Sequence, residues 1–366
     1  MNIKNIHKTV IVTILTTLVI IAVFCLNTAK TFSAADTNKM EVHFIDVGQG
    51  DATLIICGEH AMLIDTGDTA KGTAVQNYLR KQNVKKLDYL ILTHPDADHI
   101  GGAPVIITKF EIDKVFVSNY EKDNKTYQKL IQALDNKRIK AATPKAGSKY
   151  SLGTAEITII APNAEYDNPN DASVGVIIQN GDHRFLFAGD AGEDAEQDML
   201  ENGIDLSADV YHAGHHGSRT STSEAFFDAV EPSYAVISCG EGNSYGHPHA
   251  QTLNLFRTNG VKVYRTDEQG SIIAESDGTQ LSWNCSPSTT WAAGEPSNSS
   301  ASASIQEEQK DLTEARTYVC NTNTKKFHEP GCVSVKQMNG KNKQIVTLSR
   351  EEIIAQGYVP CKNCNP

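Results

Sequence analysis

The chain has 366 residues, of which 40% are hydrophobic. This is enough apolar material to bury a large core, so the composition excludes a chain that is disordered throughout. The formal net charge of −11 makes the chain acidic as a whole, and any contact with a polyanion should begin at a locally basic part of it.

The charge is distributed unevenly along the chain. Residues 1–35 contain three lysines and no acidic residue, and without them the net charge is −14. Residues 317–366 carry a net charge of +4, which leaves −18 on the rest of that shorter chain. The sequence therefore predicts an acidic body followed by a basic tail.

The N-terminal 35 residues have the pattern of a secretory signal. Lys4 and Lys8 precede the uncharged segment Thr9–Leu26, and Ser33-Ala34-Ala35 offers small residues for cleavage. We expect an exported protein that is cleaved after residue 35. The alternative is an uncleaved N-terminal anchor, although 18 uncharged residues are short for a membrane-spanning helix.

Residues 40–285 alternate between short apolar strands and helical patterns, which predicts an α/β domain with helices packed on the sheet faces. The predicted strands are Val42–Ile45, Ala52–Cys57, Ala61–Ile64, Leu87–Thr93, Glu156–Ile160, Val174–Gln179, Arg184–Ala188, Ala208–His212, Tyr234–Cys239, Val261–Tyr264 and Ser271–Ala274. The predicted helices are Gly72–Gln82, Glu193–Asn202, Ser223–Val230 and Gln251–Asn259.

Residues 286–316 are rich in serine, alanine and proline and contain few large apolar residues. Such a segment cannot bury enough surface to order itself, so we expect a disordered linker, with a marginal helix at Glu307–Ala315. Residues 317–366 should form a second compact unit.

The segment from His94 to Gly102 holds four metal-ligand side chains within six residues, at His94, Asp96, Asp98 and His99. It directly follows a predicted buried strand, so these side chains should lie at the edge of a sheet. Imidazoles and carboxylates at this spacing are typical of a site for zinc, manganese or iron.

Three further strand ends deliver candidate ligands to the same region. They carry Asp190, the pair His215 and His216, and the segment His247-Pro248-His249. Asp46 and Asp65 also end strands, where they could orient ligand histidines. Gly48 and Gly50 mark a tight backbone here, so Asp46 and Asp51 belong either to a turn or to the site.

These motifs together resemble the metallo-β-lactamase fold, and most closely the hydrolase domain of ComEC-type DNA-uptake proteins. The matching segments, which occur in the family's order, are Asp46–Asp51, Leu63–Gly67, Thr93–Gly102, Phe187–Asp190, His215–Ser218 and Tyr245–His249. The resemblance implies an αββα sandwich with a two-metal site. By the same resemblance His94 and Asp96 hold one ion, Asp98 and His99 hold the other, and Asp190 bridges them.

The sequence departs from the usual family pattern in two places. Asp96 stands where many members have a histidine, which favours manganese, and no histidine lies between His99 and His183. Asn170, Asp171 or Ser173 stands near that missing position. The last ligand remains open between His216 and His247, so we assign both, with His215 as an acid or oxyanion partner and Asp98 and Asp190 as catalytic residues.

The tail contains four ligands at zinc-finger-like spacing, which are His328, Cys332, Cys361 and Cys364. A unit of about 50 residues has a small apolar core and needs such a metal cross-link to be stable. The segment resembles the zinc-binding module of Ada-type DNA repair proteins, with His328 in place of the first of four cysteines. The alternative is a disulfide framework, which an exported location permits.

The sequence therefore predicts an exported hydrolase with two zinc or manganese ions in the large domain and one structural zinc in the tail. We expect a phosphodiesterase or nuclease that acts on DNA through a metal-activated hydroxide. The alternatives are a non-catalytic DNA-binding or uptake accessory and a cell-wall phosphodiesterase of the phosphocholine type. The expected partner is DNA or another phosphodiester, with association at the cell surface and no defined protein partner.

Overall fold

The computed structural model describes residues 38–294, 316–349, 353–354, 356–361 and 364. The predicted signal segment, most of the predicted linker and the helix expected at Glu307–Ala315 lie outside these residues. Among the described residues, no helix is long and apolar enough to cross a membrane. The chain divides into two compact units, a large one that ends near residue 293 and a small C-terminal one.

The large unit contains two sheets. The first has eight strands in the order β15-β14-β1-β2-β3-β4-β5-β6. Their bounds are β1 Met40–Phe44, β2 Thr53–Cys57, β3 His60–Ile64, β4 Lys86–Leu92, β5 Glu111–Val117, β6 Ala141–Ala142, β14 Ile272–Ser276 and β15 Leu281–Trp283.

The second sheet has seven strands in the order β13-β12-β11-β10-β9-β8-β7. Their bounds are β7 Lys149–Leu152, β8 Ala155–Ala161, β9 Gly175–Asn180, β10 His183–Phe187, β11 Val210–His212, β12 Tyr234–Ile237 and β13 Lys262–Arg265. Strands β10 to β13 run parallel to one another, as β3 to β5 do in the first sheet.

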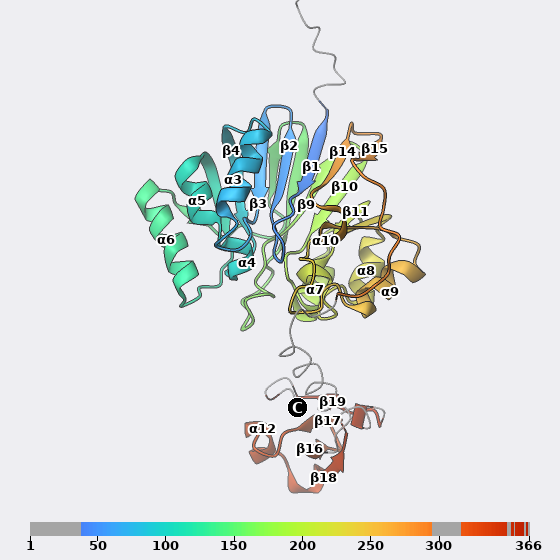
Figure 1. The fold of residues 1–366 in the computed structure, drawn as a ribbon. Coiled ribbons are helices and arrows are strands. Elements are labelled where there is room, and N and C mark those ends of the chain that lie inside the picture. Colours follow the sequence, from blue (N-terminus) through green and yellow to red (C-terminus); the bar gives the residue numbers. More distant parts are fainter. Residues whose placement is uncertain (1–37, 295–315, 350–352, 355, 362–363, 365–366) are drawn as a thin grey trace, which may run out of the picture. The chain divides into compact units, whose positions relative to one another are not determined.

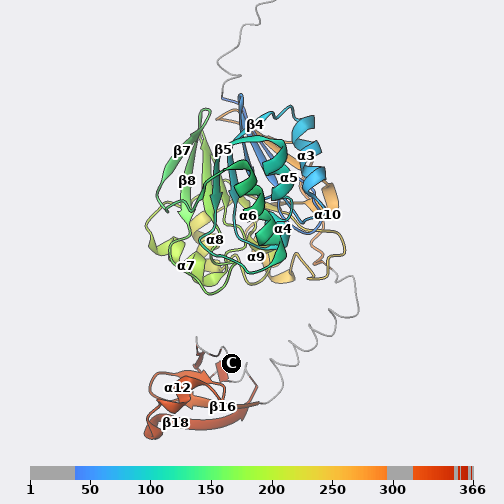
Figure 2. The ribbon, with the colours of Figure 1, turned by 90° about the vertical axis from the view of Figure 1, so that its left-hand side faces the viewer.

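Helices cover the outer face of each sheet, so the unit has four layers (Figure 1). On the first sheet lie α3 Gly72–Lys81, α4 Ala97–Ile100, α5 Ala103–Lys109 and α6 Lys125–Lys137, on the face seen in Figure 2. On the second lie α7 Glu193–Glu201, the 3-10 turn η1 Gly214–Gly217, α8 Glu224–Val230 and α9 Ala250–Thr258. A short helix, α10 Thr266–Gln269, follows β13. The expected αββα sandwich is confirmed.

The alternation of side chains along each strand explains these layers. In β10, Phe185 and Phe187 enter the core between the sheets, and Leu186 enters the core under α7, α8 and α9. In β3, Met62 points between the sheets and Leu63 points to α3 and α5. Both faces of these strands are buried, which is why their sequences are almost continuously apolar.

The small unit is built on a four-stranded sheet in the order β18-β16-β17-β19. Its elements are β16 Arg316–Asn321, β17 Lys326–His328, α12 Val333–Lys336, η2 Gly340–Asn342, β18 Lys343–Leu348 and β19 Val359–Pro360. Its apolar clusters are small and centre on Tyr318, Phe327 and Val335.

The core between the two sheets should dominate the stability of the large unit. Ile178→Ala empties a fully buried position on β9 and should lower the free energy of unfolding by about 2–5 kcal/mol. Ile131→Ala on α6 removes the same atoms from a side chain that is 39% exposed and should cost less than about 1 kcal/mol. Urea unfolding followed by circular dichroism compares the two, and equal losses would contradict this assignment of the core.

Candidate metal centre

Four buried side chains converge at one edge of the large unit. Asp51 lies between β1 and β2, His99 in α4 after β4, Asp190 after β10, and His216 in η1 after β11. Each offers a ligand atom, and these atoms lie within 4.8 Å of one another. His99 Nε2 is 3.3 Å from Asp190 Oδ1, and His216 Nε2 is 3.7 Å from Asp190 Oδ2.

The hydrogen bonds of the two histidines leave one nitrogen of each ring for this group. His99 Nδ1 donates to Asp65 Oδ2 over 2.8 Å, and His216 Nδ1 donates to the Ser238 carbonyl over 3.0 Å. Because both partners are acceptors, Nδ1 carries a proton, and Nε2 is the nitrogen that faces the group. Asp65 is itself fixed by the backbone N–H and the hydroxyl of Thr93, over 2.8 and 2.6 Å.

The group fits a divalent ion. Asp51 Oδ1, His94 Nε2, His99 Nε2, Asp190 Oδ1 and His216 Nε2 are buried and have no hydrogen-bond partner. Buried polar atoms are almost always paired, so five such atoms in one place need a common partner. Imidazole nitrogens and carboxylate oxygens are the donors that zinc and manganese take.

Unusual backbone conformations bring these side chains together. His215 and His216 have φ angles of 51° and 57°, and Asp65 has 56°. Gly50 has a φ of 128°, and a Cβ there would lie 2.4 Å from the Asp98 carbonyl oxygen. Only glycine allows this approach, which carries Asp51 into the site. Such left-handed residues are typical of functional sites.

A buried carboxylate holds the far side of the loop that carries His215 and His216. Glu196 on α7 accepts the backbone N–H groups of Thr222 and Ser223, over 2.5 and 2.8 Å. The hydroxyl of Tyr211 accepts the N–H of Gly214 over 3.0 Å. These bonds fix both ends of the loop, so its strained histidines keep their positions.

The ionisation of the group shows strong coupling. Burial disfavours the charged form of Asp190, but the neighbouring His99 and His216 hold its pKa well below the usual range. Burial likewise opposes the charge on these two histidines, but Asp190 raises their pKa. Without an ion the imidazoles therefore keep protons, and a metal must displace them to bind.

The remaining predicted residues of the first motif lie at different distances from the group. Asp98 Oδ2 is 3.3 Å from His216 Nε2, and although burial opposes its ionisation, the neighbouring His216 imidazole lowers its pKa. His94 Nε2 is 3.7 Å from Asp190 Oδ2, and burial lowers its pKa to about 4. Asp96 does not join them, because its carboxylate pairs with Lys122 Nζ at 2.5 Å.

The histidines that follow β11 and β12 separate into different roles. His215 is partly exposed, and its Nε2 is 3.7 Å from Asp190 Oδ2. The His247 ring centre is 5.4 Å from that of His215 and 5.9 Å from that of His216, and burial lowers its pKa to about 3. His216 therefore belongs to the four-residue group and His247 borders it, while their assignment as ligands stays a prediction.

Asp51 is the group member that the sequence analysis did not assign. Its signal was present, because it ends the matching segment Asp46–Asp51 directly after Gly50. Asp65 lies where an orienting carboxylate was expected. Asp46 instead accepts the N–H of Gly48 within its own turn.

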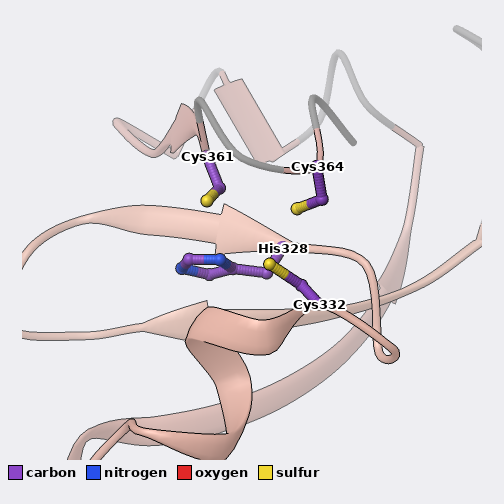
Figure 3. Close-up of side chains that lie close together, drawn as sticks. All are labelled: His328, Cys332, Cys361 and Cys364. Atoms are coloured by element: carbon purple, nitrogen blue, oxygen red, sulfur yellow. The ribbon is translucent and has the colours of Figure 1, made fainter.

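A second group lies in the small unit. It consists of His328, Cys332, Cys361 and Cys364, whose ligand atoms also lie within 4.8 Å of one another. Figure 3 shows the four side chains pointing toward one common space. His328 Nδ1 is buried without a partner. The described cysteines are free thiols, so this geometry matches the predicted zinc site and not the disulfide alternative.

The thiols of this group are electrostatically coupled. A hydrogen bond with His328 lowers the pKa of Cys332 to about 6, whereas burial raises the pKa of Cys364 to about 12. The backbone holds the pair Cys361 and Cys364 next to β17, since the Cys361 N–H donates to the Phe327 carbonyl over 3.0 Å. Three sulfurs and one imidazole suit zinc, which takes four such ligands in structural sites.

Comparisons with known proteins show the family to which the chain belongs. The chain is 29% identical over 255 residues to ComE operon protein 3 of Bacillus subtilis. The aligned region covers 64% of this chain and 33% of that protein. It is also 29% identical over 242 residues to competence protein ComA of Neisseria gonorrhoeae. This alignment covers 65% of this chain and 33% of ComA. The matched region thus spans about a third of the length of these ComEC-type competence proteins.

Among solved structures, the metallo-beta-lactamase fold protein YhfI from Bacillus subtilis is 15% identical with a TM-score of 0.43, over 65% of this chain and 99% of that one. The model of the metallo-beta-lactamase superfamily matches residues 45–241, which include Asp51, His99, Asp190 and His216. The chain therefore belongs to the metallo-beta-lactamase superfamily.

Proposed function

We propose that this chain is an exported metal-dependent hydrolase that cleaves phosphodiester bonds, with DNA as its substrate. The observation that carries the proposal is the buried group of Asp51, His99, Asp190 and His216, whose ligand atoms face one another without partners. The likeness to competence proteins and to recombination protein 2 of Haemophilus influenzae, at 28% identity over 238 residues, favours DNA. Export rests on the sequence of residues 1–35.

A divalent ion at this site would act as a Lewis acid and lower the pKa of a bound water toward neutrality. Asp190 would position that ion, because its two oxygens face His99 on one side and His215 and His216 on the other. His215 is partly exposed, and Thr220 Oγ1 lies 3.1 Å from its Nδ1. This hydroxyl orients the ring, so His215 Nε2 could donate a hydrogen bond to the oxygen of a scissile phosphate.

The small unit would hold the polymer while the large unit cleaves it. The described part of this unit is basic and contains the lysines Lys325, Lys326, Lys336, Lys341 and Lys343. A basic module joined to an acidic catalytic unit keeps a bound polymer near the site and raises its local concentration.

Metal analysis tests the foundation of this proposal. The purified full chain should contain at least one transition-metal ion in the large unit and one zinc in the small unit. Elemental analysis of the chain and of the variant Cys361→Ser/Cys364→Ser separates the two, because the variant should lose only the zinc. A chain that is metal-free after purification in metal-replete medium would refute the metal centre.

Substitution of Asp190 tests whether the site is catalytic. Asp190→Ala should reduce hydrolysis by about a hundredfold or more, because the ion and its nucleophile lose their shared positioning group. The matched control is Asp182→Ala, which removes an exposed carboxylate from the turn before the same strand, β10. The assay compares initial rates on DNA, RNA and bis-p-nitrophenyl phosphate. Unchanged rates for Asp190→Ala would place the active site elsewhere.

Binding to DNA tests the role of the small unit. Affinity of the full chain for labelled DNA should fall steeply between low and physiological salt, because phosphate contacts release counterions. Lys341→Glu/Lys343→Glu should weaken binding and flatten this salt dependence. Lys81→Glu/Lys85→Glu reverses two exposed charges of the large unit and should leave affinity unchanged. Equal effects of both variants would exclude the small unit as the DNA-holding part.

A further inference from the structure

Lys122 forms an ion pair next to the metal centre that the proposed chemistry does not use. Its Nζ lies 2.5 Å from Asp96 Oδ1, and each side chain is about one third exposed. Asp96 belongs to the loop after β4, between His94 and Asp98, whereas Lys122 lies between β5 and α6. The ion pair therefore joins two separate elements at the edge where the candidate metal ligands gather.

The segment that carries Lys122 is fixed on both sides. The hydroxyl of Ser118 donates to the Ala172 carbonyl over 2.8 Å and accepts the N–H of Tyr120 over 3.0 Å. Two residues after Lys122, the side chain of Asn124 accepts the N–H of Tyr127 over 2.8 Å and begins α6. The backbone on both sides of Lys122 is thus fixed, and its side chain pairs with Asp96.

The ion pair matters because the family resemblance assigns Asp96, together with His94, to a second ion. That ion would take His94 Nε2, which is buried without a partner, and Asp190, which the group around His99 and His216 already uses. On the other side of the His94 ring, Nδ1 faces Thr93 Oγ1 at 3.2 Å and Ser173 Oγ at 3.4 Å. If Asp96 is occupied by Lys122, the donors left near Asp190 Oδ2 are His94 Nε2 and, also at 3.7 Å, His215 Nε2. With Asp190 itself these are three donors, one fewer than the four ligands typical of zinc.

We propose that Lys122 is a tethered cation that competes with a second divalent ion for Asp96. The chain then binds one ion tightly, at the group of Asp51, His99, Asp190 and His216, and a second ion only weakly. The ammonium both occupies the carboxylate and repels an incoming cation. This inference rests on the proposed function, since it concerns the metal centre of the same site.

Titration with Mn²⁺ tests the competition. The full chain keeps zinc in its small unit and is freed of all other metal. Mn²⁺ is then added in steps, and electron paramagnetic resonance measures how much of it is bound. Thiolate sites favour zinc over Mn²⁺, so the count reports the large unit. The native chain should bind a second Mn²⁺ at least about tenfold more weakly than the first, and Lys122→Gln should tighten only the second ion, by about tenfold.

Three controls isolate the charge at Asp96. Lys122→Arg keeps a cation beside Asp96 and should retain weak binding of the second ion. Lys125→Gln removes the same charge from an exposed residue of α6 and should change nothing. Asp96→Asn combined with Lys122→Gln should abolish the gain, because the freed carboxylate is gone.

The outcomes separate this inference from the proposed function. Two ions of equal affinity in the native chain, or no change in Lys122→Gln, would overturn the competition and leave the hydrolase proposal standing. Failure of the native chain and all variants to bind Mn²⁺ or Zn²⁺ in the large unit would overturn both.

Discussion

The arrangement of the large unit depends on one electrostatic constraint, which is the burial of several carboxylates and imidazoles at a single place. Asp51, Asp65, Asp190, His99 and His216 are all buried. A buried charge is costly unless it is paired or binds a cation. Asp65 meets this requirement through Thr93 and His99, whereas the inner atoms of the other residues have no hydrogen-bond partner. Such a group is expected only where an ion completes it.

The apolar core between the two sheets stabilises the unit enough to offset the cost of burying these charges. It also positions the charged side chains. The strands that deliver ligands are buried on both faces by the core between the sheets and by the outer helices. Their hydrogen-bonded ladders leave little freedom at the strand ends, so side chains placed there are held in position. The strain at His215 and His216 is local, and the bonds of Glu196 and Tyr211 to the same loop oppose its relaxation.

The resemblance to the metallo-β-lactamase fold predicted the four layers. The apolar runs predicted most of the strands that carry the site, because these runs are long and end in distinctive motifs. The sequence patterns did not predict β5, β7 and α6, among other elements, which are short or rich in charged residues. They also left Asp51 undecided, because its role depends on the approach of Gly50 to the Asp98 carbonyl. The pairing of Asp96 with Lys122 could not be predicted either, since the two residues are 26 positions apart and no local pattern links them.

Both units bring candidate metal ligands together, but the ligands have a different relation to the apolar core in each unit. In the large unit an extensive core comes first, and it holds polar groups in an arrangement suited to an ion. The small unit has few buried apolar residues, and its ligands lie at β17, at the start of α12 and after β19. Cross-linking these elements would supply the stability that so small a core cannot. We therefore expect metal binding to follow from folding in the large unit and to be a condition for folding in the small unit.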